Sequence, residues 1–179
     1  MGTDNAQAEY ISLNKSMSRI AYGDVTALDV LYKDLKKPVF MLALSILRDY
    51  PSAEDMMQET FLKVSEKADT YTAGTNPKAW VLTIARNLAL NTLKKRSRET
   101  LTLEELGETA ADENGLHDDN DFTHTMQQLD EPERSIVTLR IVCSLRHAEI
   151  AKIVGLSAGD TRVRYSRALK KLKKYYETI

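Results

Sequence analysis

The side chains best suited to chemistry in this sequence are basic residues near its end, and the chemistry they suit is phosphate binding. Seven lysines and arginines, and no acidic residue, lie between Arg162 and Lys174. At helical spacing one face would collect Arg164, Arg167, Lys171 and Lys174. Such a face can neutralise nucleic-acid phosphates and release their counterions. A solvated lysine-rich helix end, which also suits the helix dipole, is the alternative interpretation.

The residues just before this basic segment have the pattern of a helix-turn-helix. The stretch 148–151 predicts a short helix, and Gly155 can supply a left-handed backbone at the turn that follows. Leu156 is expected to plug the turn, and Ser157 to cap the next helix. A helix-turn-helix presents its second helix to the DNA major groove. Nucleic acid is therefore the partner that this part of the chain predicts.

Helical periodicity continues through the first half of the chain, and no segment alternates like a strand. A helix is expected to begin near Asp24, and Pro38 to break or kink it before the apolar stretch Val39–Leu47. Ser52 is expected to cap the following helix, because Asp55 stands at the capping-box position. These patterns predict an all-α fold.

Two later helix starts carry equally local signals. Asn76 is expected to cap a helix that has Pro77 in its first turn. Asp130 is expected to cap another, with Pro132 in its first turn. Within the last helix, Thr161, Tyr165, Ala168, Leu172 and Tyr176 are expected to form the buried stripe.

Charge divides the chain into parts, although its net charge is only −1. The segment 99–124 contains nine acidic residues and no lysine or arginine. Because it also has few large apolar residues, we expect it to be a flexible acidic linker. The sequence thus predicts two small helical domains, 22–98 and 125–179, after an N-terminal lead-in at 1–21.

No residue pattern predicts catalysis, a metal or a cofactor, and we expect a protein that is not an enzyme. The single cysteine, Cys143, excludes an internal disulfide and is expected to be a buried structural thiol. The acidic residues between His117 and His124 lack the glycine and distal glutamate of a calcium loop. The chain opens without a secretory signal, and Val39–Leu47 is too short to span a bilayer. A cytoplasmic protein without a membrane partner is expected.

Two separated groups of motifs resemble one protein family. AEDMMQETFLKV at 53–64, followed by NPKAWVLTIARNLALNTLKKRSR at 76–98, resembles the second conserved region of bacterial sigma factors. LDEPERSIVTLR, AEIAKIVGLSAG and YSRALKKLKK resemble their fourth region. With only these two regions and a linker between them, the chain resembles the extracytoplasmic-function (ECF) group of the sigma-70 family. The resemblance covers roughly residues 22–176 and implies a region 2 helical bundle and a region 4 helix-turn-helix.

The resemblance implies a contact between the helix at 53–64 and core RNA polymerase. The matching surface of the family docks on a basic coiled coil of the largest polymerase subunit. Its counterpart here is the exposed stripe Asp55, Gln58, Glu59 and Leu62. Carboxylates can orient such a contact while the leucine supplies buried area. Alternatively, the acidic residues only favour the start of their helix.

The resemblance also implies that the helix after Asn76, with the loop 69–75 before it, recognises the −10 promoter element. In the family a base of the opened strand is flipped out and read there. The exposed stripe expected to contact this DNA is Thr83, Asn87, Asn91, Lys94, Lys95 and Arg98. Amides can read base edges while basic side chains hold phosphates, although asparagines can also simply be tolerated on a wet surface. The family more often has an acid in place of Asn91, and Trp80 is expected to pack in the core.

In the second domain, the resemblance implies a helix that reads the −35 element as duplex DNA. The groove-facing positions are Arg162, Val163, Ser166 and Arg167, while Arg164 and Lys171 are expected to meet phosphates. The family usually has Thr-Val just after the turn, where this chain has Asp160 and Thr161. Asp160 suits a helix start but places a negative charge near the groove.

Taken together, the resemblance implies a promoter-specificity subunit that binds core RNA polymerase, recognises the −10 and −35 elements and directs transcription initiation. An anti-sigma factor is an expected further partner. The alternative is a free-standing helix-turn-helix regulator that binds duplex DNA without polymerase at a two-fold symmetric site. A helical interaction protein with a merely solubilising basic tail would show no salt-dependent DNA affinity.

Overall fold

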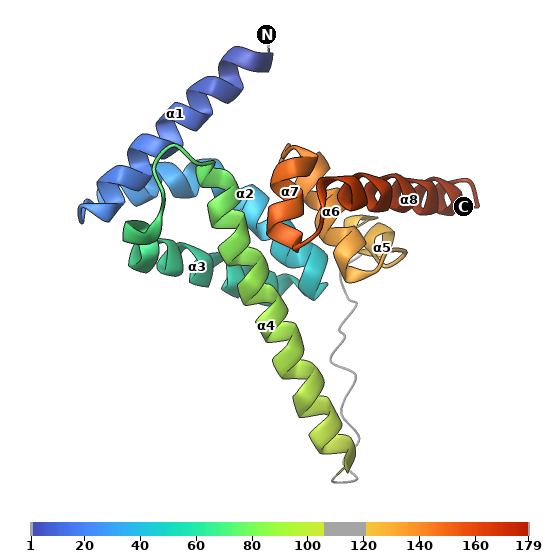
Figure 1. The fold of residues 1–179 in the computed structure, drawn as a ribbon. Coiled ribbons are helices and arrows are strands. Elements are labelled where there is room, and N and C mark those ends of the chain that lie inside the picture. The colour runs from blue at the N-terminus through green and yellow to red at the C-terminus, as the bar shows by residue number, and fades with distance from the viewer. Residues whose placement is uncertain (1, 106–120, 179) are drawn as a thin grey trace.

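The structure is a computed structural model that describes residues 2–105 and 121–178, and within these ranges it contains helices and no strand (Figure 1). The predicted all-α class is therefore confirmed. The elements are α1 (Gly2–Ala21), α2 (Thr26–Leu47), α3 (Tyr50–Lys67), the 3-10 turn η1 (Ala68–Thr70), α4 (Pro77–Glu105), α5 (Asp121–Met126), α6 (Glu131–Ile141), α7 (His147–Val154) and α8 (Ala158–Tyr176). None of the described helices is long and apolar enough to cross a membrane.

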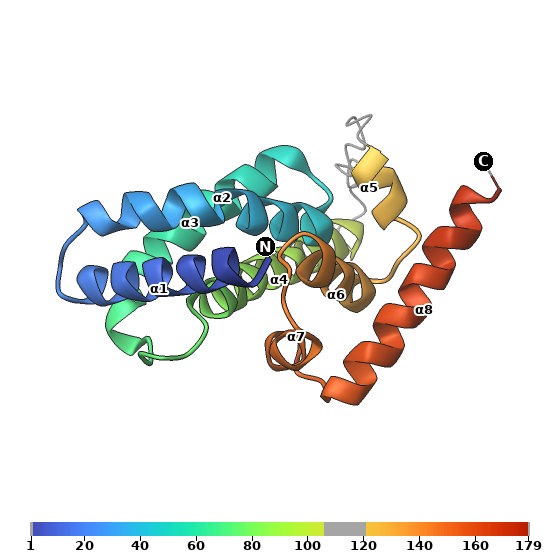
Figure 2. The same ribbon diagram turned by 90° about the horizontal axis from the view of Figure 1, so that it is seen from above.

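The first body of the fold is built around α2, which α1, α3 and α4 surround (Figures 1 and 2). The inward residues of α2 recur every three or four positions and are fully buried, as expected for a helix packed on several sides: Leu31, Leu35, Val39, Leu42 and Ile46. The segment 1–21 is more than a lead-in, because α1 buries Leu13, Met17 and Ile20 in the same core.

The break expected at Pro38 and the cap expected at Ser52 are both wrong. Pro38 does not end its helix, since α2 runs without interruption from Thr26 to Leu47. The carbonyl that Pro38 leaves without a donor belongs to Asp34, an exposed residue, so water can replace the lost hydrogen bond. Ser52 is not a cap either. The cap of α3 is Asp49, whose side chain accepts a hydrogen bond from the Ser52 backbone N–H at 3.0 Å.

The other predicted caps are confirmed. Asn76 Oδ1 accepts from the backbone N–H of Ala79 at 3.2 Å. Asp130 caps α6 in a capping box with Glu133. Ser157 caps α8, and Gly155 ends α7 with a φ of 72° in the left-handed region that favours glycine.

The second body consists of α6, α7 and α8, which contact one another in every pairing. Ile136, Leu139 and Ile150 are its largest fully buried side chains. From α8, Thr161 and Ala168 are buried as predicted. Tyr176 was expected in the same stripe but is 59% exposed. At that end of α8 the neighbouring helix is α5, and the Tyr176 hydroxyl lies 2.6 Å from Thr125 Oγ1 of α5.

The two bodies pack directly against each other, with α6 along α2 and α7 beside α4 (Figure 2). One continuous apolar cluster joins them and includes Cys143, which is 1% exposed. Cys143 is buried, as predicted, and burial raises the pKa of its thiol to about 12. Polar contacts cross the same boundary. Arg86 Nη2 lies 3.1 Å from Glu131 Oε1, and Asn76 Nδ2 lies 2.7 Å from Glu149 Oε1.

The predicted linker overlaps with helices at both of its ends. α4 continues through Glu105, and α5 begins at Asp121. The rest of the predicted linker, including His117, lies outside the described residues.

The Arg86–Glu131 pair should contribute measurably to stability. In Glu131→Ala the almost buried Arg86 guanidinium loses its carboxylate, so we expect the free energy of unfolding to fall by about 1–3 kcal/mol. Denaturant titration followed by circular dichroism measures the loss. Glu177→Ala, which breaks an exposed pair with Lys173, is the matched control and should change little. Equal losses in the two variants would contradict the assigned role of Glu131.

Candidate nucleic-acid interface

The helix α8 presents the side chains predicted to enter a DNA groove. Arg162, Val163, Ser166 and Arg167 are all exposed on it. The helix lies at the outer side of the second body and extends away from the first (Figures 1 and 2).

The unusual residue Asp160 belongs to the start of α8. The Ser157 hydroxyl donates to Asp160 Oδ2 at 2.7 Å, and the Asp160 backbone N–H donates to Ser157 Oγ at 3.0 Å. The departure from the family pattern is thus part of the helix cap.

The two residues of α8 predicted to bind phosphates have different surroundings. Arg164 is half-buried, whereas Lys171 reaches back to α6. Lys171 Nζ lies 2.6 and 2.7 Å from the two carboxylate oxygens of Glu133, a residue only 6% exposed. Glu133 also accepts from the Asp130 backbone N–H at 3.1 Å. One carboxylate therefore ties α8 to the start of α6, and sequence reasoning missed it because 38 residues separate the partners.

His147 lies at the start of α7, as predicted, and contacts α8. Its ring meets the Tyr165 ring edge-on, with 5.3 Å between centroids. Burial lowers the pKa of His147, and the positive charges of Arg140 and Arg162 lower it further. The imidazole is therefore neutral at pH 7 and acts as a packing group inside the helix-turn-helix.

The outer face of α4 carries the residues predicted to contact the −10 element. Its exposed members are Asn87, Asn91, Lys94, Lys95 and Arg98. Thr83 differs, because it is half-buried and its hydroxyl donates to the Ala79 carbonyl at 2.8 Å. Their contacts with DNA stay a prediction.

Trp80 packs against the core, as expected, but is only half-buried. Its ring meets that of Tyr71 edge-on at 5.7 Å.

The loop 71–76, which leads into α4, is held by residues of α1. Tyr10 donates its hydroxyl hydrogen to the Gly74 carbonyl at 2.8 Å. Asn14 Oδ1 accepts from the Tyr71 hydroxyl at 2.7 Å and lies 3.4 Å from the Gly74 backbone N–H. The sequence gives no signal for these contacts, since 57 to 64 residues separate the partners.

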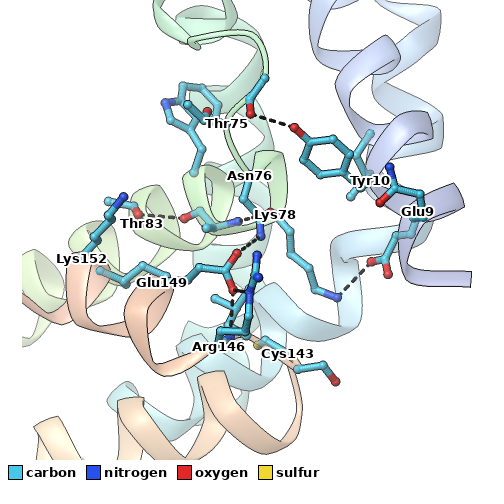
Figure 3. A pocket seen from close by; sticks show the side chains of 18 residues that line it. Glu9, Tyr10, Thr75, Asn76, Lys78, Thr83, Cys143, Arg146, Glu149 and Lys152 are labelled. Atoms are coloured by element: carbon cyan, nitrogen blue, oxygen red, sulfur yellow. Dashed lines mark hydrogen bonds and ion pairs between the residues drawn. The ribbon is translucent and has the colours of Figure 1, made fainter. Parts of the chain in front are cut away.

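A groove of about 1060 Å³ lies between α1, the start of α4 and the segment before and within α7 (Figure 3). Lys78 Nζ binds Glu9 Oε1 at 3.0 Å on one side. On the other side, Glu149 accepts from Asn76 and from the Arg146 backbone N–H at 2.8 Å. Burial opposes ionisation of Glu149, but these hydrogen bonds and the charge of Arg146 lower its pKa overall. Four of the charged side chains that line the groove, Glu9, Lys78, Arg146 and Glu149, are thus already paired.

No cluster of side chains suited to a metal ion occurs in the groove or elsewhere in residues 2–105 and 121–178. The acidic residues around His117 fall outside these ranges.

The outer face of α3 presents the residues predicted to contact polymerase. Asp55, Gln58 and Leu62 are exposed, the last by 59%, and Glu59 is half-buried. The opposite face of the helix buries Phe61 in the first core. The stripe is therefore accessible in this arrangement, and its partner stays a prediction.

Comparison with known proteins identifies the class. Residues 31–99 match the model of Sigma-70 region 2, and residues 119–172 match that of Sigma-70 region 4. The RNA polymerase sigma factor CarQ of Myxococcus xanthus is 29% identical over 163 residues, which cover 88% of this chain and 93% of CarQ. The ECF RNA polymerase sigma factor SigE of Mycolicibacterium smegmatis is 30% identical over 169 residues, 87% of this chain and 65% of SigE.

Solved structures agree with this assignment. The sigma factor RpoE of Bartonella quintana, in complex with the anti-sigma factor NepR, superposes with a TM-score of 0.72 and 27% identity, over 83% of this chain and 96% of RpoE. CnrH, solved with the cytosolic domain of CnrY, shares the fold at a TM-score of 0.73 and 20% identity, over 93% of this chain and 98% of CnrH. The chain therefore belongs to the sigma-70 family, in its ECF group.

The Lys171–Glu133 contact predicts an unequal effect of two neighbouring substitutions. Lys171→Met leaves the buried Glu133 carboxylate without its ammonium partner, so the melting temperature should fall by about 2–6 °C. Lys170→Met removes an exposed charge on the same helix and should leave it almost unchanged. Thermal denaturation followed by circular dichroism compares them. If Lys171 served DNA alone, both variants would melt like the parent protein.

Proposed function

We infer that this protein is an ECF sigma factor: a subunit that binds core RNA polymerase, recognises −10 and −35 promoter elements and directs transcription initiation. The observation that carries this inference is the occurrence of both sigma regions, in order, on two helical bodies with accessible outer faces. The protein performs no covalent chemistry in this proposal. It supplies binding energy that places the polymerase and helps to hold the opened strand.

Each outer face has a proposed partner. The α3 stripe Asp55, Gln58, Glu59 and Leu62 would meet core polymerase. The α4 face Thr83, Asn87, Asn91, Lys94, Lys95 and Arg98 would meet the opened −10 strand. The α8 face Arg162, Val163, Arg164, Ser166 and Arg167 would meet the −35 duplex. Lys171 would act there chiefly through its pairing with Glu133, which sets the position of α8.

An anti-sigma factor is the second proposed partner. RpoE of Bartonella quintana, solved with its anti-sigma factor, superposes over both bodies of this chain. The packed arrangement of the two bodies is therefore suited to being held by such a partner. A sigma factor that reads two separate elements has to rearrange these bodies on the polymerase, and a partner that prefers the packed state would oppose that change.

Transcription in vitro tests the function directly. Core polymerase is incubated with a pool of randomised promoter templates, with and without the protein, and the new start sites are sequenced. We expect new starts that share an asymmetric pair of elements and that depend on the protein. A free-standing regulator would instead bind duplex DNA tightly without polymerase and at a two-fold symmetric site. If the polymerase gains no start sites, the proposed function is wrong.

Substitutions on α3 test the polymerase contact separately. Asp55→Lys reverses a charge and Leu62→Glu removes an exposed apolar contact, so each should weaken binding to core polymerase about tenfold or more. Asp29→Lys, a charge reversal on the exposed side of α2, is the control and should bind like the parent protein. Fluorescence titration of labelled protein with core polymerase measures all three affinities. Unchanged affinity in both α3 variants would show that α3 is not part of the polymerase interface.

A further inference from the structure

The loop 71–76 has little hydrophobic support of its own. Residues 72–75 are exposed, and Gly74 adopts a φ of 84°. Within the loop, the Thr75 hydroxyl and the Thr75 backbone N–H both donate hydrogen bonds to the Thr72 carbonyl, at 2.8 and 3.2 Å. A short exposed loop held only by such local contacts opens easily. Its shape therefore depends on what holds it from outside.

The middle of the loop is held from outside by one face of α1, while Asn76 at its end binds Glu149 on α7. Tyr10 and Asn14 lie one helical turn apart and each reaches the loop, the first at the Gly74 carbonyl and the second at the Tyr71 hydroxyl. The carboxamide of Asn14 is itself oriented, because its Nδ2 donates to the Tyr10 carbonyl at 3.0 Å. That bond points Oδ1 of Asn14 toward the loop. Next to Tyr10, Glu9 binds Lys78 in the first turn of α4.

The Tyr71 hydroxyl is shared between two acceptors, Asn14 Oδ1 and the Thr75 carbonyl at 2.6 Å. Burial raises the pKa of Tyr71, so the phenol remains a donor at neutral pH. Its ring also meets Trp80 on α4. Tyr71 thus joins α1, the loop and α4 in one network.

The helix α1 lies outside the region 2 match, which begins at residue 31. We propose that Tyr10 and Asn14 of α1 are positioning residues that hold the loop 71–76 in the shape that reads the −10 strand. This proposal rests on the proposed function. Its physical basis is preorganisation: a loop ordered before DNA arrives loses less entropy on binding and discriminates bases more sharply.

The test measures base discrimination rather than activity alone. With the full chain, core polymerase and a promoter selected from the random pool, transcription is compared between the selected −10 element and single-base variants of it. Tyr10→Phe with Asn14→Ala should lower this ratio about three- to tenfold, as expected for losing the hydrogen bonds that these two side chains make to the loop. Discrimination at the −35 element and affinity for core polymerase should not change. A merely structural defect would reduce transcription from every promoter alike.

Two control variants change the same kinds of chemical group as the test variants. Tyr22→Phe removes a hydroxyl from a tyrosine that is 93% exposed next to the end of the same helix, and it should keep the full ratio. Asn14→Asp keeps an oxygen that can accept from Tyr71 but loses the Nδ2 donor to the Tyr10 carbonyl, so it should recover only part of the ratio that Asn14→Ala loses. If the double variant proves unfolded by circular dichroism, Tyr10→Phe alone carries the test.

Two negative results are distinguishable. If the parent protein initiates no transcription, the proposed function fails and this proposal with it. If the parent protein initiates normally but the α1 variants keep its −10 ratio, the function stands and the positioning role of Tyr10 and Asn14 is wrong.

Discussion

The burial of α2 is the constraint on which the rest of the structure depends. Leu35, Val39 and Leu42 are fully buried, and each such side chain contributes about 1.5–3 kcal/mol to folding. Because α1, α3 and α4 cover α2 in the first body and α6 covers it from the second, all four must turn their polar faces outward. The accessible stripes of α3 and α4 are therefore a consequence of packing. The same packing brings α7 beside α4, so the body that carries α8 shares one core with α4, and α8 and α4 are the helices proposed to serve the two promoter elements.

Polar groups at the boundary between the two bodies fix how the bodies are aligned and still allow them to separate. Asn76 illustrates the point, because its Oδ1 caps α4 while its Nδ2 binds Glu149 on α7. Arg86 and Glu131 make a second polar contact across the boundary. Paired charges of this kind add little net stability compared with apolar groups of the same size, but a misplaced pair is strongly unfavourable. An interface built partly from such charge pairs has one preferred arrangement. It can still open, because the separated charges can be hydrated or can bind a new partner.

Local signals predicted the parts of this fold that are determined locally. The caps at Asn76, Asp130 and Ser157 depend on residues within three positions of each other, so the sequence shows them directly. Asp49 was missed because Ser52, three residues later, has equally good capping chemistry, and only the extended backbone at Asp49 decides between them. Pro38 was misjudged because its effect depends on the exposure of the preceding turn. The contacts of α1 with the loop 71–76 required the tertiary fold, as did the pairing of Lys171 with Glu133.

The distribution of charge on α8 bears on how such a chain could bind DNA. Lys171 is occupied by Glu133, and Asp160 adds a negative charge beside the turn, so fewer cations face the groove than the sequence suggests. With a net charge of −1, the chain has no overall attraction to phosphate. Weak contacts at two DNA elements become strong only when both are presented together, because the second then binds at high effective concentration. The placement of charge therefore favours a protein that reads DNA from within a larger assembly over one that binds alone.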